Sequence, residues 1–76
     1  MARLTPIHYN KSESFLIKVG CEFVRQEGDH LIYKRANLSR PLIIPVETEL
    51  PMFIIRNNLR ALGIKRDEYL KILEEL

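Results

Sequence analysis

The sequence predicts an α+β fold, in which helices cover one face of a three-stranded antiparallel sheet. Three observations support this prediction. Three short runs with strand character lie together between residues 21 and 46. Stretches with helical spacing of apolar residues precede them, over 10–19, and follow them, over 51–76. The chain of 76 residues is short enough to be one domain, 1–76. The expected element order is α-β-β-β-α-α, with the second sheet face open.

The first helix is expected to begin at Asn10, an N-cap residue with Glu13 at the third helical position in a variant of the capping box. Before it, residues 1–9 are expected to be extended, because Pro6 disfavours helix at the preceding residue. Gly20 is expected to end the helix in the left-handed conformation. The apolar residues that recur at helical spacing are Phe15, Leu16 and Val19.

A β-hairpin is expected next. Residues 21–25 and 31–34 have strand propensity, whereas the four residues between Arg25 and His30 are poor strand formers. Gly28 supplies the positive φ that a short connection requires, and Asp29 tolerates a turn by bonding to its own backbone. His30 is then expected just inside the second strand, where its backbone is fixed and its imidazole still contacts solvent.

The alternation of side chains divides the second strand into two faces. Each face contains an apolar residue and a cation, so the pattern leaves open which face the helices cover. One face carries His30, Ile32 and Lys34, and the other carries Leu31, Tyr33 and Arg35.

The third strand and two further helices complete the expected order. Residues 42–46 are nearly all apolar, and Pro45 is expected at an edge or bulge because it lacks a backbone donor. Pro51 can open the second helix and Gly63 is expected to end it. The last helix is expected over 66–76, with acidic residues in its first turn.

His30 is the strongest candidate for chemistry in the sequence. A neutral imidazole with an unperturbed pKa of about 6.5 can accept or donate a proton near neutral pH. The alternative is that His30 is an ordinary half-buried strand residue, since single histidines are common in strands.

The positive charge is unevenly distributed. The formal net charge is +2, and the basic excess lies in residues 1–46, which contain the expected sheet. A polyanion such as RNA is therefore a reasonable partner, although a solvated surface explains so small an excess equally well. Lys11 and Lys18 lie two helical turns apart, so they share a face of the first helix and are candidates for phosphate contacts.

Several motifs are absent from the sequence. It has no phosphate-binding glycine loop, no zinc-spaced cysteine and histidine pairs and no nucleophile elbow, so no metal or cofactor is expected. The single cysteine, Cys21, is expected to be buried, although a nucleophile paired with His30 is conceivable. No apolar run approaches the roughly 20 residues of a membrane span, and the N-terminus lacks a signal-peptide core. The cytoplasm is the expected location.

A set of short motifs occurs in a recognisable order along the chain. Residues 23–30 read Phe-Val-Arg-Gln-Glu-Gly-Asp-His, residues 44–46 read Ile-Pro-Val, and residues 59–64 read Leu-Arg-Ala-Leu-Gly-Ile before an acidic terminal helix. Together they resemble the HicA (YcfA-like) toxins of type II toxin–antitoxin systems. The resemblance runs over residues 10–75.

The resemblance implies a fold like that of double-stranded-RNA-binding domains, α-β-β-β-α, with an extra C-terminal helix. It also implies a metal-independent endoribonuclease that cleaves mRNA, an mRNA interferase, and a HicB-type antitoxin that covers its active surface. The family's catalytic histidine maps onto His30, preceded by Gly28 and by Asp29, which stands where the family has serine. Phe53 and Ile54 stand where the family has Gly-Thr.

A ribonuclease without a metal also needs cations that bind the phosphate. Candidates near the histidine are Arg25, Lys34 and Arg35, in addition to Lys11 and Lys18. Two other functions remain open. One is a non-catalytic RNA-binding module, or a degenerate family member that keeps the fold and the partner. The other is a protein-interaction domain whose open sheet face binds a partner.

Overall fold

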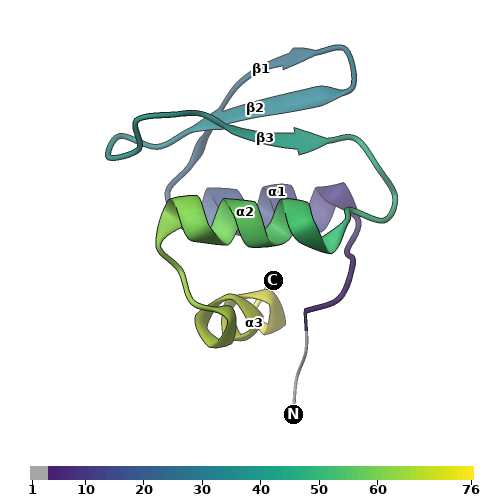
Figure 1. The fold of residues 1–76 in the computed structure, drawn as a ribbon, viewed down its shortest axis with the longest axis vertical. Helices are drawn as coiled ribbons and strands as arrows, with labels where there is room; N and C mark the ends of the chain where they lie inside the picture. Colours follow the sequence, from purple (N-terminus) through teal and green to yellow (C-terminus); the bar gives the residue numbers. More distant parts are fainter. Residues whose placement is uncertain (1–3) are drawn as a thin grey trace.

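The computed structural model describes residues 4–76. Its elements are α1 (Tyr9–Lys18), β1 (Glu22–Glu27), β2 (His30–Lys34), β3 (Leu42–Pro45), α2 (Met52–Leu62) and α3 (Arg66–Glu74). The strands form one antiparallel sheet in the order β1-β2-β3. Figure 1 shows α1 and α2 below one face of this sheet and α3 below the two helices. The predicted class, element order and open sheet face are confirmed.

The core lies between the sheet and the helices. Leu31 and Tyr33 of β2 and Leu42 and Ile44 of β3 belong to one buried cluster with residues of the helices, so these four residues point toward the helices. We call this the covered face. Leu50 joins the core just before α2, where its N–H donates to the carbonyl of Ile7. The helices contribute Phe15, Leu16, Ile55, Leu59, Leu62 and Tyr69.

The first helix begins earlier than predicted. His8, and not Asn10, is the N-cap, and its Nδ1 accepts a hydrogen bond of 3.1 Å from the N–H of Asn10. An imidazole nitrogen thus replaces the usual short side-chain oxygen, so Asn10 lies inside the helix and Glu13 has no capping role. Of the segment predicted to be extended, Tyr9 is helical and residues 1–3 lie outside the described part of the chain.

The end of α1 follows the prediction. Gly20 has a φ of 94°, and its N–H donates to the carbonyl of Ile17 while the N–H of Cys21 donates to that of Leu16. These two bonds form a Schellman motif, which turns the chain sharply toward β1. Cys21 is buried as predicted, and burial raises the pKa of its thiol. A buried, protonated thiol is a packing residue and a poor nucleophile.

The hairpin is tighter than the sequence suggested. Gln26 and Glu27 belong to β1, so only Gly28 and Asp29 form the connection, and Glu27 pairs directly with His30. Gly28 has a φ of 58°, as predicted. The strand continues to the turn because the side chain of Gln26 donates to the carbonyl of Gly28 at 3.0 Å. Local polar contacts therefore outweigh weak strand propensity at this turn.

Candidate active site on the open face of the sheet

The structure decides which face of β2 carries His30. Leu31 and Tyr33 are buried against the helices, so the alternating residues His30 and Lys34 point to the opposite side, where both are exposed. On β3, Ile43 and Pro45 lie on that same side. We call it the open face, and its polar residues on β1 and β2 are Glu22, Arg25, Glu27, His30 and Lys34.

A β-bulge brings Arg25 to the open face. Phe23 pairs with Tyr33 and Arg25 pairs with Ile32, so Val24 is the extra residue. Without it, Phe23 and Arg25 would lie on the same face, because side chains in a regular strand alternate. With the extra residue, the Phe23 ring packs edge-on against Tyr33 on the covered face, with 5.5 Å between the ring centroids. Arg25 then lies on the same face as His30.

The backbone of His30 is held on both sides. Glu27 of β1 lies directly opposite it, and Pro45 of β3 lies opposite on the other side. The carbonyl of Asp29 accepts a hydrogen bond of 2.8 Å from the N–H of Val46, which ties the turn to the end of β3. Within residues 4–76 the imidazole makes no hydrogen bond, so it is free to meet a ligand from solvent.

The cation nearest to His30 in the sheet register is Arg25. It occupies the diagonal position next to Glu27, at about 7–8 Å in an antiparallel pair. The guanidinium Nε of Arg25 forms an ion pair with the carboxylate of Glu27, and both side chains are exposed. Such an exposed pair has a small net energy, so a phosphate could replace the carboxylate at little cost.

Lys34 is the other cation of the open face. It is four residues from His30 along β2, or about 13 Å, and its cross-strand partner is Glu22. Its ammonium therefore reaches a different part of an extended ligand from the part that contacts the imidazole.

Arg35 lies on the covered side and is not brought together with His30. Its Nη1 donates to the carbonyl of Val19 at 3.2 Å, its Nη2 to that of Leu62 at 3.4 Å, and its Nε to Asn37 at 2.8 Å. Val19 and Leu62 are at the C-terminal ends of α1 and α2, where a cation is favoured. Arg35 thus ties the two helix ends together.

Lys11 and Lys18 are also separate from the histidine. Both are exposed on α1, a helix on the covered side of the sheet (Figure 1), whereas His30 lies on the open face. Of the five predicted cations, the structure therefore places only Arg25 and Lys34 on the histidine's face.

Two general properties complete the description of residues 4–76. No three side chains of histidine, cysteine, aspartate or glutamate gather closely enough to hold a metal ion in this part of the chain. None of its helices combines the length and apolar character needed to cross a membrane.

The sequence of the hairpin and its flanking helices matches the model of a known family. Residues 9–64, from α1 to just beyond α2, match the family model described as the HicA toxin of bacterial toxin–antitoxin systems. The chain belongs to the HicA toxin family. The HicA match includes the hairpin and His30, confirms the resemblance found in the sequence, and makes this protein a toxin of a toxin–antitoxin system. Neither the curated proteins nor the solved structures provided a match.

Sequence reasoning missed one polar contact beside this HicA hairpin. The hydroxyl of Tyr33 donates to the carboxylate of Glu13 between β2 and α1. Burial, and then this hydrogen bond, raise the pKa of Tyr33. The two residues are 20 positions apart, and no local pattern connects a helical acid with a strand tyrosine. Only the face assignment of β2 could have suggested the contact.

Proposed function

We propose that this HicA-family protein is a metal-independent endoribonuclease, an mRNA interferase, in which His30 acts as the general base. One observation carries the proposal: the histidine that matches the family motif is exposed on the open face, and its backbone is fixed between two strands. A rigid backbone with an accessible imidazole suits general acid–base catalysis on a large, extended substrate. The cytoplasm, where mRNA is translated, is the expected location.

The proposed reaction uses the RNA's own 2′-hydroxyl. Neutral His30 accepts the proton of this hydroxyl, and its oxygen attacks the adjacent phosphorus. The bond from phosphorus to the 5′-oxygen breaks, and water supplies the proton to the leaving oxygen. Arg25, released from Glu27, would stabilise the charge on the phosphoryl oxygens. The products are a 2′,3′-cyclic phosphate and a 5′-hydroxyl.

Lys34 has a different proposed role. Because it lies about 13 Å from His30 along β2, it would bind a neighbouring phosphate of the same RNA strand. This contact positions the substrate and makes binding salt-dependent. A HicB-type antitoxin would neutralise the toxin by covering the open face.

The test is cleavage of end-labelled mRNA in the presence of a chelator. The expected result is cleavage by the unaltered protein, with 2′,3′-cyclic phosphate ends, and a loss of about 10²–10⁴-fold for His30→Ala. His8→Asn is the matched control, because it removes the other histidine but keeps an N-cap acceptor for α1. Cleavage by His30→Ala at the unaltered rate would exclude the histidine mechanism.

A second candidate is a non-catalytic family member that binds RNA or its antitoxin without cleavage. The acidic surroundings of the histidine favour this function. Glu27 forms an ion pair with Arg25 and so competes with a phosphate for it, and Asp29 stands in place of the family's serine. Retention of labelled RNA without any cleavage, unchanged in His30→Ala, is the result that supports it.

A further inference from the structure

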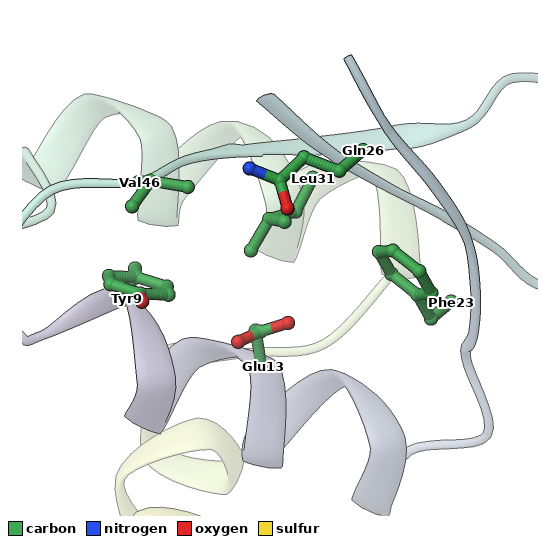
Figure 2. A pocket seen from close by; sticks show the side chains of 6 residues that line it. All are labelled: Tyr9, Glu13, Phe23, Gln26, Leu31 and Val46. Carbon is green, nitrogen blue, oxygen red and sulfur yellow. The ribbon is translucent and has the colours of Figure 1, made fainter. Parts of the chain in front are cut away.

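A second site lies on the other side of the hairpin. A pocket of about 320 Å³ opens between α1 and β1, one of the two edge strands of the sheet. Figure 2 shows the carboxylate of Glu13 pointing into it from α1, with Tyr9 and Phe23 on opposite sides. Leu31 and Val46 form an apolar wall, and the side chain of Gln26 extends over the pocket.

Among residues 4–76, the carboxylate of Glu13 has no counter-charge. It is partly buried, and one of its oxygens accepts the hydroxyl hydrogen of Tyr33. In the stretch from residue 4 to 76, the one ion pair within 4.0 Å joins Arg25 to Glu27, so no cation lies on Glu13. A carboxylate has about four acceptor sites. Most of them remain free and face the pocket.

The walls of the pocket also favour a cation. Phe23 and Tyr9 offer aromatic rings, whose faces attract a positive group. The apolar wall can cover the methylene stem of a long side chain. None of the described residues that line the pocket is basic, so a phosphate would meet the negative charge of Glu13. This combination does not fit a nucleotide.

We propose that the pocket binds an arginine side chain of the antitoxin partner. The guanidinium would pair with the free oxygens of Glu13, and its stem would lie along Leu31 and Val46. A protein source fits the position of the pocket, because it opens beside edge strand β1, on the covered side that the ribonuclease reaction does not use. The identity of the partner rests on the function proposed above, whereas binding of the side chain does not.

The first test is an NMR titration of the isotope-labelled protein with a capped Ala-Arg-Ala peptide. Saturable shifts of the amides of Glu13, Gln26 and Val46 are expected. The citrulline peptide, which has the same shape without the charge, should bind on the order of ten-fold more weakly. Glu13→Gln should lower the affinity for the arginine peptide by a similar factor, since it keeps an acceptor for Tyr33 but removes the charge. Glu75→Gln, an exposed acid at the end of α3, is the matched control and should bind as the unaltered protein does.

A further variant tests the aromatic wall. Phe23→Leu keeps the apolar bulk. It should lower the affinity for the arginine peptide by about two- to five-fold, which is the contribution of an exposed cation–π contact. Equal binding of the arginine and citrulline peptides, or no shift with either, would overturn the proposal. Shifts of the same amides by guanosine monophosphate, but not by the arginine peptide, would identify a base-binding pocket and also overturn it.

A second measurement uses the co-purified toxin–antitoxin complex. Glu13→Gln should increase dissociation of the antitoxin on the order of ten-fold, while Glu75→Gln leaves it unchanged. An unchanged complex would exclude the antitoxin as the source of the arginine. The peptide titration is independent of RNA cleavage, so a protein that cleaves no RNA would refute the proposed function without affecting this site.

Discussion

On its open face the sheet exposes His30 and Lys34 to solvent, whereas on its covered face it buries Tyr33 and bonds Arg35 to two helix ends. These four residues, in or just after β2, thus form two pairs. Each pair has one side chain that can exchange a proton, His30 or Tyr33, and one cation, Lys34 or Arg35. On the open face these groups have few partners within the described chain. On the covered face they are fixed by Glu13 and by backbone carbonyls. Chemical type alone therefore does not separate site residues from structural ones.

The largest expected difference between the faces concerns two neighbouring isoleucines of β3. Ile44 is 0% exposed on the covered face, and Ile43 is 46% exposed on the open face. Ile44→Ala should lower the free energy of unfolding by about 2–5 kcal/mol, because it leaves a cavity in the core. Ile43→Ala should cost about 1 kcal/mol or less. Urea denaturation measures both, and equal losses would refute the assignment of the two faces.

The two cations Lys34 and Arg35 should respond in opposite ways. Arg35→Ala removes donors from the carbonyls of Val19 and Leu62, so we expect a loss of stability of about 1.5–3 kcal/mol. Lys34→Ala should change stability by about 0.5 kcal/mol or less, but it should weaken RNA binding and reduce its salt dependence. Denaturation and filter binding at several salt concentrations measure the two effects. A stable Arg35→Ala with reduced RNA affinity would make Arg35 a phosphate-binding residue and not a structural one.

Two buried tyrosines provide the next comparison. Tyr33→Phe removes the hydrogen bond to Glu13 and should cost about 1 kcal/mol of stability. The hydroxyl of Tyr69 has no partner within residues 4–76, so Tyr69→Phe should be neutral or stabilising by a few tenths to about 1 kcal/mol. Thermal denaturation of the two variants beside the unaltered protein distinguishes these outcomes. A larger loss for Tyr69→Phe would show that its hydroxyl has a partner.

Both tyrosines should also make stability fall at high pH. Burial raises the pKa of Tyr69 to about 12, and burial with the Glu13 bond raises the pKa of Tyr33. The folded state therefore keeps these protons longer than the unfolded chain does. Their contribution is complete below the ordinary tyrosine pKa of about 10 and is lost as pH rises through the folded values. Urea midpoints from pH 8 upward should fall above about pH 10, and less so in Tyr33→Phe.

The smallest expected effect concerns the ion pair beside His30. Glu27→Gln frees Arg25 from its carboxylate, so RNA affinity should increase by about two- to five-fold at low salt. Stability should change by about 0.5 kcal/mol or less, as for other exposed pairs. The matched control is Glu75→Gln, an exposed acid at the end of α3, which should leave RNA affinity unchanged. No gain in affinity for Glu27→Gln would remove Arg25 from the proposed phosphate site.

Much of the fold could be predicted from the sequence because it depends on local patterns. The alternation of β2 separated His30 from Tyr33 before the structure did, and Gly20 and Gly28 marked a helix end and a turn that both require positive φ. The family motif then identified His30. The covered face could not be chosen, because each face of β2 carries one apolar residue and one cation, and only packing against α1 and α2 decides between them.

Other features depend on contacts that no short pattern reveals. The bulge at Val24 reverses the alternation of β1, so the sequence alone would place Phe23 and Arg25 on one face. The N-cap is His8 and not the predicted Asn10, because the imidazole Nδ1 of His8 accepts the hydrogen bond expected of a side-chain oxygen. Glu13 was expected to act within its own helix, but it bonds to a strand residue instead. These residues lie beside the histidine site and the Glu13 pocket, so neither site could be described from the sequence alone.

Pro45 has a consequence for how the toxin can associate. It lies opposite His30 on β3, an outer strand whose one partner strand within the described residues is β2. Because proline has no amide hydrogen, the rim of the sheet beside the histidine cannot donate a backbone bond at this position to an additional strand. Fibril-like stacking of copies through this rim is therefore disfavoured.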